Sequence, residues 1–124
     1  MRWVAFGTLL LLAAPAAGAD ILSSRPTFRA GQTTVTCTIV NVGSTLVTVS
    51  NPKVAAEVGP TFDLQLAPNE CRSTLGPTQN CTWNAATRTG GAHLCRVTVS
   101  NKAGLRGQMG IRGSGLLLGA TEMR

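Results

Sequence analysis

Four cysteines constrain this chain more than any other feature of its sequence. Cys37, Cys71, Cys81 and Cys95 all follow an N-terminal segment typical of export, so we expect disulfides rather than free thiols. Four cysteines allow three pairings. The short separation of Cys71 and Cys81, and the place of Cys37 and Cys95 on two strongly alternating segments, favour Cys71–Cys81 and Cys37–Cys95. Two such bridges would supply much of the stability of a small domain.

The N-terminal segment has the parts of a signal peptide. Arg2 provides the positive start, an apolar run covers about residues 4–14, and small residues follow it. The run is shorter than the roughly 20 residues that a transmembrane helix needs. We therefore predict a signal peptide over residues 1–19, cleavage after Ala17-Gly18-Ala19, and a single mature domain over residues 20–124 in the periplasm or outside the cell.

Most of the mature sequence alternates between apolar and polar residues, as half-buried strands do. Val35, Cys37 and Ile39 share one side of the clearest segment, with threonines on the other side. No segment of the mature chain has a sustained helical period. We predict an all-β, two-sheet antiparallel sandwich of about seven or eight short strands, over residues 33–39, 46–50, 61–66, 71–75, 81–86, 94–100 and 105–112. Residues 113–124 fit either a final edge strand or a frayed tail.

Some boundaries are less regular. Val40 and Val42 fall out of phase with the preceding apolar row, which predicts a bulge or a change of sheet there. Asn51-Pro52 is expected to end the second strand, because proline cannot donate to a ladder. Residues 54–58 fit either a strand or one helical turn. Residues 71–75 and 81–86 flank a turn-rich stretch, so a hairpin-like loop closed by its own disulfide is expected.

Three turn segments resemble those of bacterial extracytoplasmic immunoglobulin-like domains, including the cell-adhesion-related type. They are Asn41-Val42-Gly43-Ser44, residues 66–70 and residues 91–99, and the resemblance covers most of residues 33–99. It implies an immunoglobulin-like sandwich but no particular chemistry. The chain departs from the family where Asn69 replaces the usual turn glycine and where no tyrosine can form a tyrosine corner.

Arg96, Arg106 and Arg112 are the candidate binding residues. If the two late strands pair, these side chains join Gln108 on one outer face and form a basic strip, whose alternative role is a solvated, edge-protecting surface. The mature domain would carry ten basic side chains (11 minus Arg2) against five acidic ones, which favours anionic partners. Nucleic acid is disfavoured because few aromatic residues are available for stacking.

Other chemistries have weaker support. The cysteines lack the close pairs of a structural zinc site, so no metal or cofactor is expected. His93 is the only histidine, and we expect it at the surface, at a strand start, without a triad motif around it. Asp63 and Glu70 are expected to be solvated surface carboxylates.

Two further features stand near the third cysteine. Asn80-Cys81-Thr82 matches a glycosylation acceptor. Trp83 is expected to pack over a disulfide.

These observations predict a non-catalytic exported interaction or structural module of the cell envelope or extracellular space. Its partner would be an unidentified protein or an anionic envelope component. Two alternatives remain: a small extracytoplasmic enzyme that uses His93, and a subunit that donates residues 113–123 as a strand to a partner's sheet.

Overall fold

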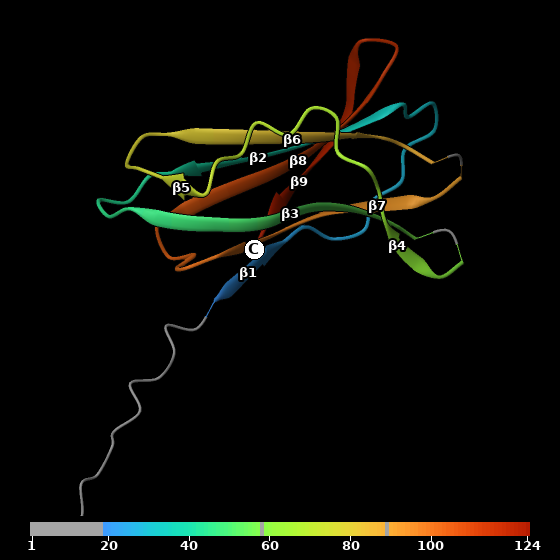
Figure 1. Ribbon diagram of the computed structural model, residues 1–124. Helices are drawn as coiled ribbons and strands as arrows, with labels where there is room; N and C mark the ends of the chain where they lie inside the picture. The colour runs from blue at the N-terminus through green and yellow to red at the C-terminus, as the bar shows by residue number, and fades with distance from the viewer. Residues whose placement is uncertain (1–18, 58, 89) are drawn as a thin grey trace, which may run out of the picture.

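Two antiparallel β-sheets packed face to face form this protein (Figure 1). The computed structural model describes residues 19–124 without residues 58 and 89, so the predicted signal peptide lies almost wholly outside the described residues. All the regular structure in the described residues is strand. The strands are β1 Asp20–Ser23, β2 Thr34–Asn41, β3 Val47–Glu57, β4 Thr61–Asp63, β5 Thr74–Leu75, β6 Asn80–Ala86, β7 Ala92–Val99, β8 Leu105–Gly113 and β9 Leu116–Met123.

The strands divide into two sheets that mix distant parts of the chain. The five-stranded sheet has the order β1-β7-β3-β4, with β5 also paired to β3. The four-stranded sheet has the order β6-β2-β8-β9. The predicted all-β sandwich is therefore confirmed, and each sheet buries one face against the other.

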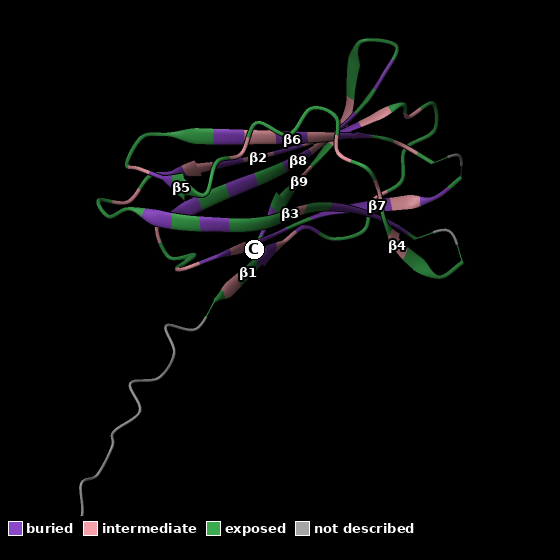
Figure 2. Cartoon of the chain, in the orientation of Figure 1, coloured by how far each residue is buried: buried purple, intermediate pink, exposed green. Residues whose placement is uncertain are grey.

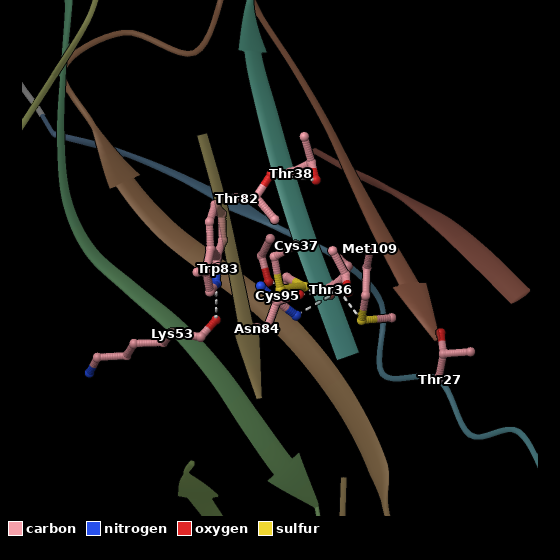
Figure 3. The surroundings of a disulfide bond; sticks show 12 residues. Thr27, Thr36, Cys37, Thr38, Lys53, Thr82, Trp83, Asn84, Cys95 and Met109 are labelled. Carbon is pink, nitrogen blue, oxygen red and sulfur yellow. Dashed lines mark hydrogen bonds between the residues drawn. A yellow bond between two sulfur atoms is a disulfide. The ribbon is translucent and has the colours of Figure 1, made fainter. Parts of the chain in front are cut away.

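Both predicted disulfides are present. Cys37 on β2 is bonded to Cys95 on β7, so this bridge joins the two sheets through the middle of the core. Cys71 is bonded to Cys81 at the start of β6. Trp83 is fully buried and lies beside the Cys37–Cys95 bridge (Figure 3).

The bulge predicted at the end of the first strong strand is wrong. The pairing of β2 with both neighbours is regular, and Asn41 continues the inward row of Val35, Cys37 and Ile39. A buried amide is tolerated because its hydrogen bonds are satisfied. The Asn41 side chain donates to the carbonyls of Thr45 and Leu75 at 2.8 and 2.9 Å and accepts the Gly43 N–H at 3.0 Å.

Asn51-Pro52 does not end the second strand, in contrast to the prediction. β3 continues to Glu57, and residues 54–57 are strand rather than a helical turn. The register shifts between Ser50 and Lys53, and Asn51 has a φ of 48°. This bulge takes the proline out of the regular ladder, so its missing N–H costs the sheet nothing.

The middle of the chain crosses between the sheets instead of forming a hairpin. β4 and β5 are shorter than predicted, and β5 pairs with β3 rather than with β6. Between them, Ala67 and Glu70 donate to the carbonyls of Asn84 and Thr82 at 2.8 and 2.9 Å. The crossing segment thereby covers the outer edge of β6, which would otherwise be open to association with another strand.

The last strand is paired on one side and covered on the other. β8 and β9 form a hairpin whose tip rises from the sandwich at the upper right of Figure 1. Ser114 and Gly115 both have positive φ, as a two-residue type I′ turn requires. Along the far side of β9, Ser24 bridges to Met123, and Thr27 Oγ1 lies 3.2 Å from Thr121 Oγ1.

Candidate binding face

The structure divides the three candidate arginines between the two sheets. Arg96 lies on β7 of the five-stranded sheet, whereas Arg106 and Arg112 lie on β8 of the four-stranded sheet. The predicted pairing of these two strands is wrong, because β8 pairs with β2 and β9. Their apolar rows do face the same core, but from opposite sheets. Alternation identifies the buried face of a strand and leaves its neighbour undetermined.

Arg96 belongs to a surface of mixed charge. It is exposed on the outer face of its sheet, in register with Lys53 on β3 and Ser23 on β1. Lys53 forms an exposed ion pair with Asp63 at 3.2 Å. A carboxylate beside the basic residues makes this surface a poorer anion site than a purely basic one.

The outer face of the four-stranded sheet has a different character. Polar side chains occupy most of the outward positions of three of its four strands, β6, β2 and β8. Thr36 Oγ1 donates to Asn84 Oδ1 at 2.7 Å, and the hydroxyls of Thr38 and Thr82 lie 3.2 Å apart. We call this surface the threonine–arginine face; it consists of Thr34, Thr36, Thr38, Thr82, Asn84, Arg106, Gln108 and Arg112.

A shallow groove runs along β8 on this face. One hollow of about 230 Å³ is lined by Thr38, Arg106 and Gln108 among others. A second, of about 110 Å³, shares Thr38 and Gln108 and extends to Arg112. The second hollow exists because Gly110 offers no side chain at the outward position between Gln108 and Arg112. Arg106 and Arg112 therefore stand at the two ends of one groove, about 20 Å apart along the strand.

The charges at the groove are available for a ligand. Within the described part of the chain, neither Arg106 nor Arg112 forms an ion pair. The nearest carboxylate in the register is Glu122 of β9, opposite Gln108, and it contacts Arg124 at 3.4 Å. Two exposed guanidinium groups with hydroxyl and amide groups between them can bind carboxylate, sulfate or phosphate oxygens.

His93 is fully buried, so the prediction of a surface position is wrong. Its Nε2 accepts the Arg88 backbone N–H at 2.9 Å, and its Nδ1 lies 3.4 Å from the Gln32 amide nitrogen. The Gln32 amide also donates to the Gly91 carbonyl at 2.8 Å. The imidazole therefore joins the β6–β7 loop to the segment before β2, and these contacts provide it with no nucleophile or carboxylate.

Acid should weaken the fold through this histidine. Burial lowers the pKa of His93 below 6.5, against a smaller opposing effect of a backbone hydrogen bond to Gly91, because the core disfavours the imidazolium. The unfolded chain binds this proton first, so stability is complete above about pH 6.5 and falls as the pH drops towards the lowered pKa. Urea unfolding between pH 8 and pH 5 should show this decline in the wild type and lose it in His93→Gln. An equal decline in both proteins would contradict the assignment.

The other candidate residues are solvent-facing. Asp63, Glu70 and Asn80 are exposed. Glu70 and Asn80 line a cleft of about 470 Å³ beside the Cys71–Cys81 bridge, together with Arg72 and Thr82. Its lining carries both signs of charge and little apolar surface.

Metal-binding clusters and membrane-spanning helices are absent from the residues that the structure describes, 19–57, 59–88 and 90–124. Across these ranges, no cluster of three or more histidine, cysteine, aspartate or glutamate side chains could hold a metal ion. In the same ranges, no helix has the length and apolar character to cross a bilayer. The two disulfides indicate an oxidising, exported compartment.

Sequence reasoning identified the outward arginines but missed the surface to which they belong. The alternation of Thr34, Thr36 and Thr38 was a visible signal of an outward polar row. What was missing was the neighbour of that row, since only the sheet order brings β2 between β6 and β8.

The chain was also compared with known proteins. No family model matches it, and neither the curated proteins nor the solved structures gave a significant match.

Proposed function

We propose that this chain is a non-catalytic, exported interaction module that binds an anionic component of the cell envelope or the extracellular space through its threonine–arginine face. The observation that carries the proposal is the groove between Arg106 and Arg112, two exposed guanidinium groups without an ion pair in the described residues. A flat, polar and regular sheet face suits an extended polyanion better than a small enclosed substrate.

The compartment is part of the proposal. The signal-like residues 1–19 and the two disulfides support export, and a periplasmic or extracellular address would bring the face to envelope polymers. The two-sheet sandwich with a bridge between the sheets supports the immunoglobulin-like resemblance. We retain that resemblance as a proposal about architecture.

The two alternatives have less support. An enzyme that uses His93 needs the imidazole in a pocket beside a nucleophile or carboxylate, whereas the ring is buried against backbone groups and Gln32. Strand donation needs residues 113–123 to be unpaired, whereas β9 pairs with β8 along Leu116–Met123.

Replacing both groove arginines should weaken binding to the native envelope. Arg106→Gln together with Arg112→Gln is expected to reduce retention by up to about thirtyfold, since two exposed charge pairs contribute up to about 2 kcal/mol and ~1.4 kcal/mol corresponds to a factor of ten. Retention of the labelled, exported protein on isolated envelope fractions measures this effect. Wild-type retention should also fall as salt is raised.

Arg96→Gln is the matched control. It removes one positive charge from an exposed strand position on the other sheet, so it matches Arg106→Gln or Arg112→Gln made alone. Retention should then stay close to that of the wild type. If Arg96→Gln lowers retention as much as the double variant does, net charge rather than the face is responsible; if neither variant changes it, the face is not the binding surface.

A further inference from the structure

The tip of the β8–β9 hairpin exposes two adjacent leucines. Leu116 is 68% exposed and Leu117 is 56% exposed. The hairpin rises above the sandwich, and its outer part is coloured as exposed in Figure 2. A projecting hairpin is an unusual place for two large apolar side chains, because it leaves them in contact with water.

The tip is held in one shape by close backbone packing. The Gly31 carbonyl lies against Gly113, so close that any side chain at Gly113 would clash with it. Gly113 is also in contact range of Leu118, which therefore folds back towards the hairpin rather than outward. The two-residue turn at Ser114-Gly115 completes this arrangement. The backbone at the base of the hairpin is therefore tightly packed, and this packing holds the two leucines in their exposed positions.

A third apolar side chain lies on the neighbouring segment. Phe28 is 49% exposed and stands between Thr27, which contacts Thr121, and Arg29, whose side chain lies beside Gly119. Both contacts are with β9. Phe28 therefore lies on the segment beside β9, next to residues 119–121, and the apolar tip itself consists of Leu116 and Leu117.

Two arginines lie beside this hairpin. Arg112 is in register with Leu117, and Arg29 packs against the same strand at Gly119. Arg25 and Arg88 lie elsewhere: Arg25 lines a hollow with Thr121 and Glu122, and the Arg88 guanidinium lies 5.7 Å from the centre of the Phe62 ring. Glu57 is in register with Ala92 in the five-stranded sheet, which is not the sheet that carries the hairpin.

We infer that the hairpin tip docks on an anionic lipid bilayer, with Leu116 and Leu117 entering the interface between headgroups and acyl chains. The projecting leucines can leave water by entering the acyl-chain region of the bilayer. The arginines behind them can then contact the lipid phosphates of the headgroup region. Two or three apolar side chains give weak, reversible binding rather than stable anchoring. The tip adjoins the groove, because Arg112 and Leu117 both line the groove's second hollow. Arg106 stands at the other end of the groove, so a change there tests the groove without touching the tip.

Vesicle binding by the exported, disulfide-bonded protein tests the inference. The protein should sediment with vesicles of phosphatidylglycerol and phosphatidylcholine and much less with phosphatidylcholine alone. Leu116→Ser with Leu117→Ser should reduce binding to the anionic vesicles about tenfold or more, because it removes the inserted surface. Arg29→Gln should lower binding and narrow the difference between the two vesicle types.

The turn between β2 and β3, at the other end of the sandwich, provides a control. Val42 and Leu46 are 58% and 63% exposed in the turn between β2 and β3, so Val42→Ser with Leu46→Ser removes similar apolar surface away from the tip. That variant should bind like the wild type, as should Arg106→Gln, which tests the groove alone. Equal binding by the leucine variant and the wild type would overturn the inference.

A tryptophan placed at the tip distinguishes insertion into the bilayer from other kinds of binding. Leu116→Trp should be quenched by brominated lipids in anionic vesicles, and Leu46→Trp should not. An unquenched tip would overturn insertion. Concentration-dependent dimerisation that needs Leu116 and Leu117, without vesicle binding, would instead assign the tip to contact with a second copy of the chain.

Discussion

Replacing Cys37 and Cys95 together by alanine is expected to lower the free energy of unfolding by about 4 kcal/mol. The bridge closes a loop with a sequence separation of 58, and the loss of this constraint stabilises the unfolded chain by that amount on the chain-entropy model. Small domains have a total stability of about 5–15 kcal/mol, so this loss would remove between about a quarter and most of it. Urea unfolding with near-ultraviolet circular dichroism measures the change.

The second bridge provides the comparison. Cys71→Ala with Cys81→Ala opens a loop with a separation of only 10, for which the same model gives about 3 kcal/mol. Cys37 and Cys95 are also fully buried, whereas Cys71 is only partly buried, so their loss removes core contacts as well. A smaller loss at the core bridge than at the loop bridge would show that chain entropy and burial do not govern the stability of this domain.

The buried faces of the strands were predictable because they depend on local sequence. Alternation placed Val35, Cys37 and Ile39 on one side, and the structure buries all three. The same local logic predicted the pairing of Cys37 with Cys95, since both cysteines lie on inward positions of strong strands. Local pattern and a covalent constraint point to the same core, which explains why the all-β sandwich could be predicted.

The neighbours of each strand were not predictable in the same way. The pattern of β7 and β8 is equally consistent with pairing in one sheet and with facing each other across the core. The chain takes the second arrangement, and Arg96 is thereby separated from Arg106 and Arg112. The prediction that the three arginines face outward was therefore correct, and the prediction that they share one surface was wrong.

Polar residues in the interior were the other source of error. His93 was expected at the surface, and Asn41 was recognised only as part of a turn segment, because polar side chains are usually exposed. Both are fully buried, since each finds hydrogen-bond partners on neighbouring loops: Asn41 holds the turn after β2, and His93 holds the loop before β7. These partners lie far away in the sequence or in loops, so the alternation of apolar and polar residues does not predict them.

Trp83→Ala is expected to cost about 3–5 kcal/mol of unfolding free energy, which makes it the largest single-residue effect that we predict. Trp83 is fully buried and is in register with Cys37 on the neighbouring strand. Its indole Nε1–H donates to the Lys53 carbonyl at 3.0 Å, so one side chain of β6 holds the bulged part of β3 in the opposite sheet (Figure 3). Urea unfolding of the exported protein, with its disulfides intact, measures the loss.

Trp83→Phe separates the packing of the ring from its hydrogen bond. Phenylalanine retains most of the apolar contact but leaves the Lys53 carbonyl without its donor, which should cost about 1–3 kcal/mol. Thr82 and Asn84 flank Trp83 and point outward into the threonine–arginine face, so the same strand connects core packing to that face. If Trp83→Phe is as stable as the wild type, the indole hydrogen bond does not hold β3; if Trp83→Ala costs under about 1 kcal/mol, the core does not depend on this side chain as its burial implies.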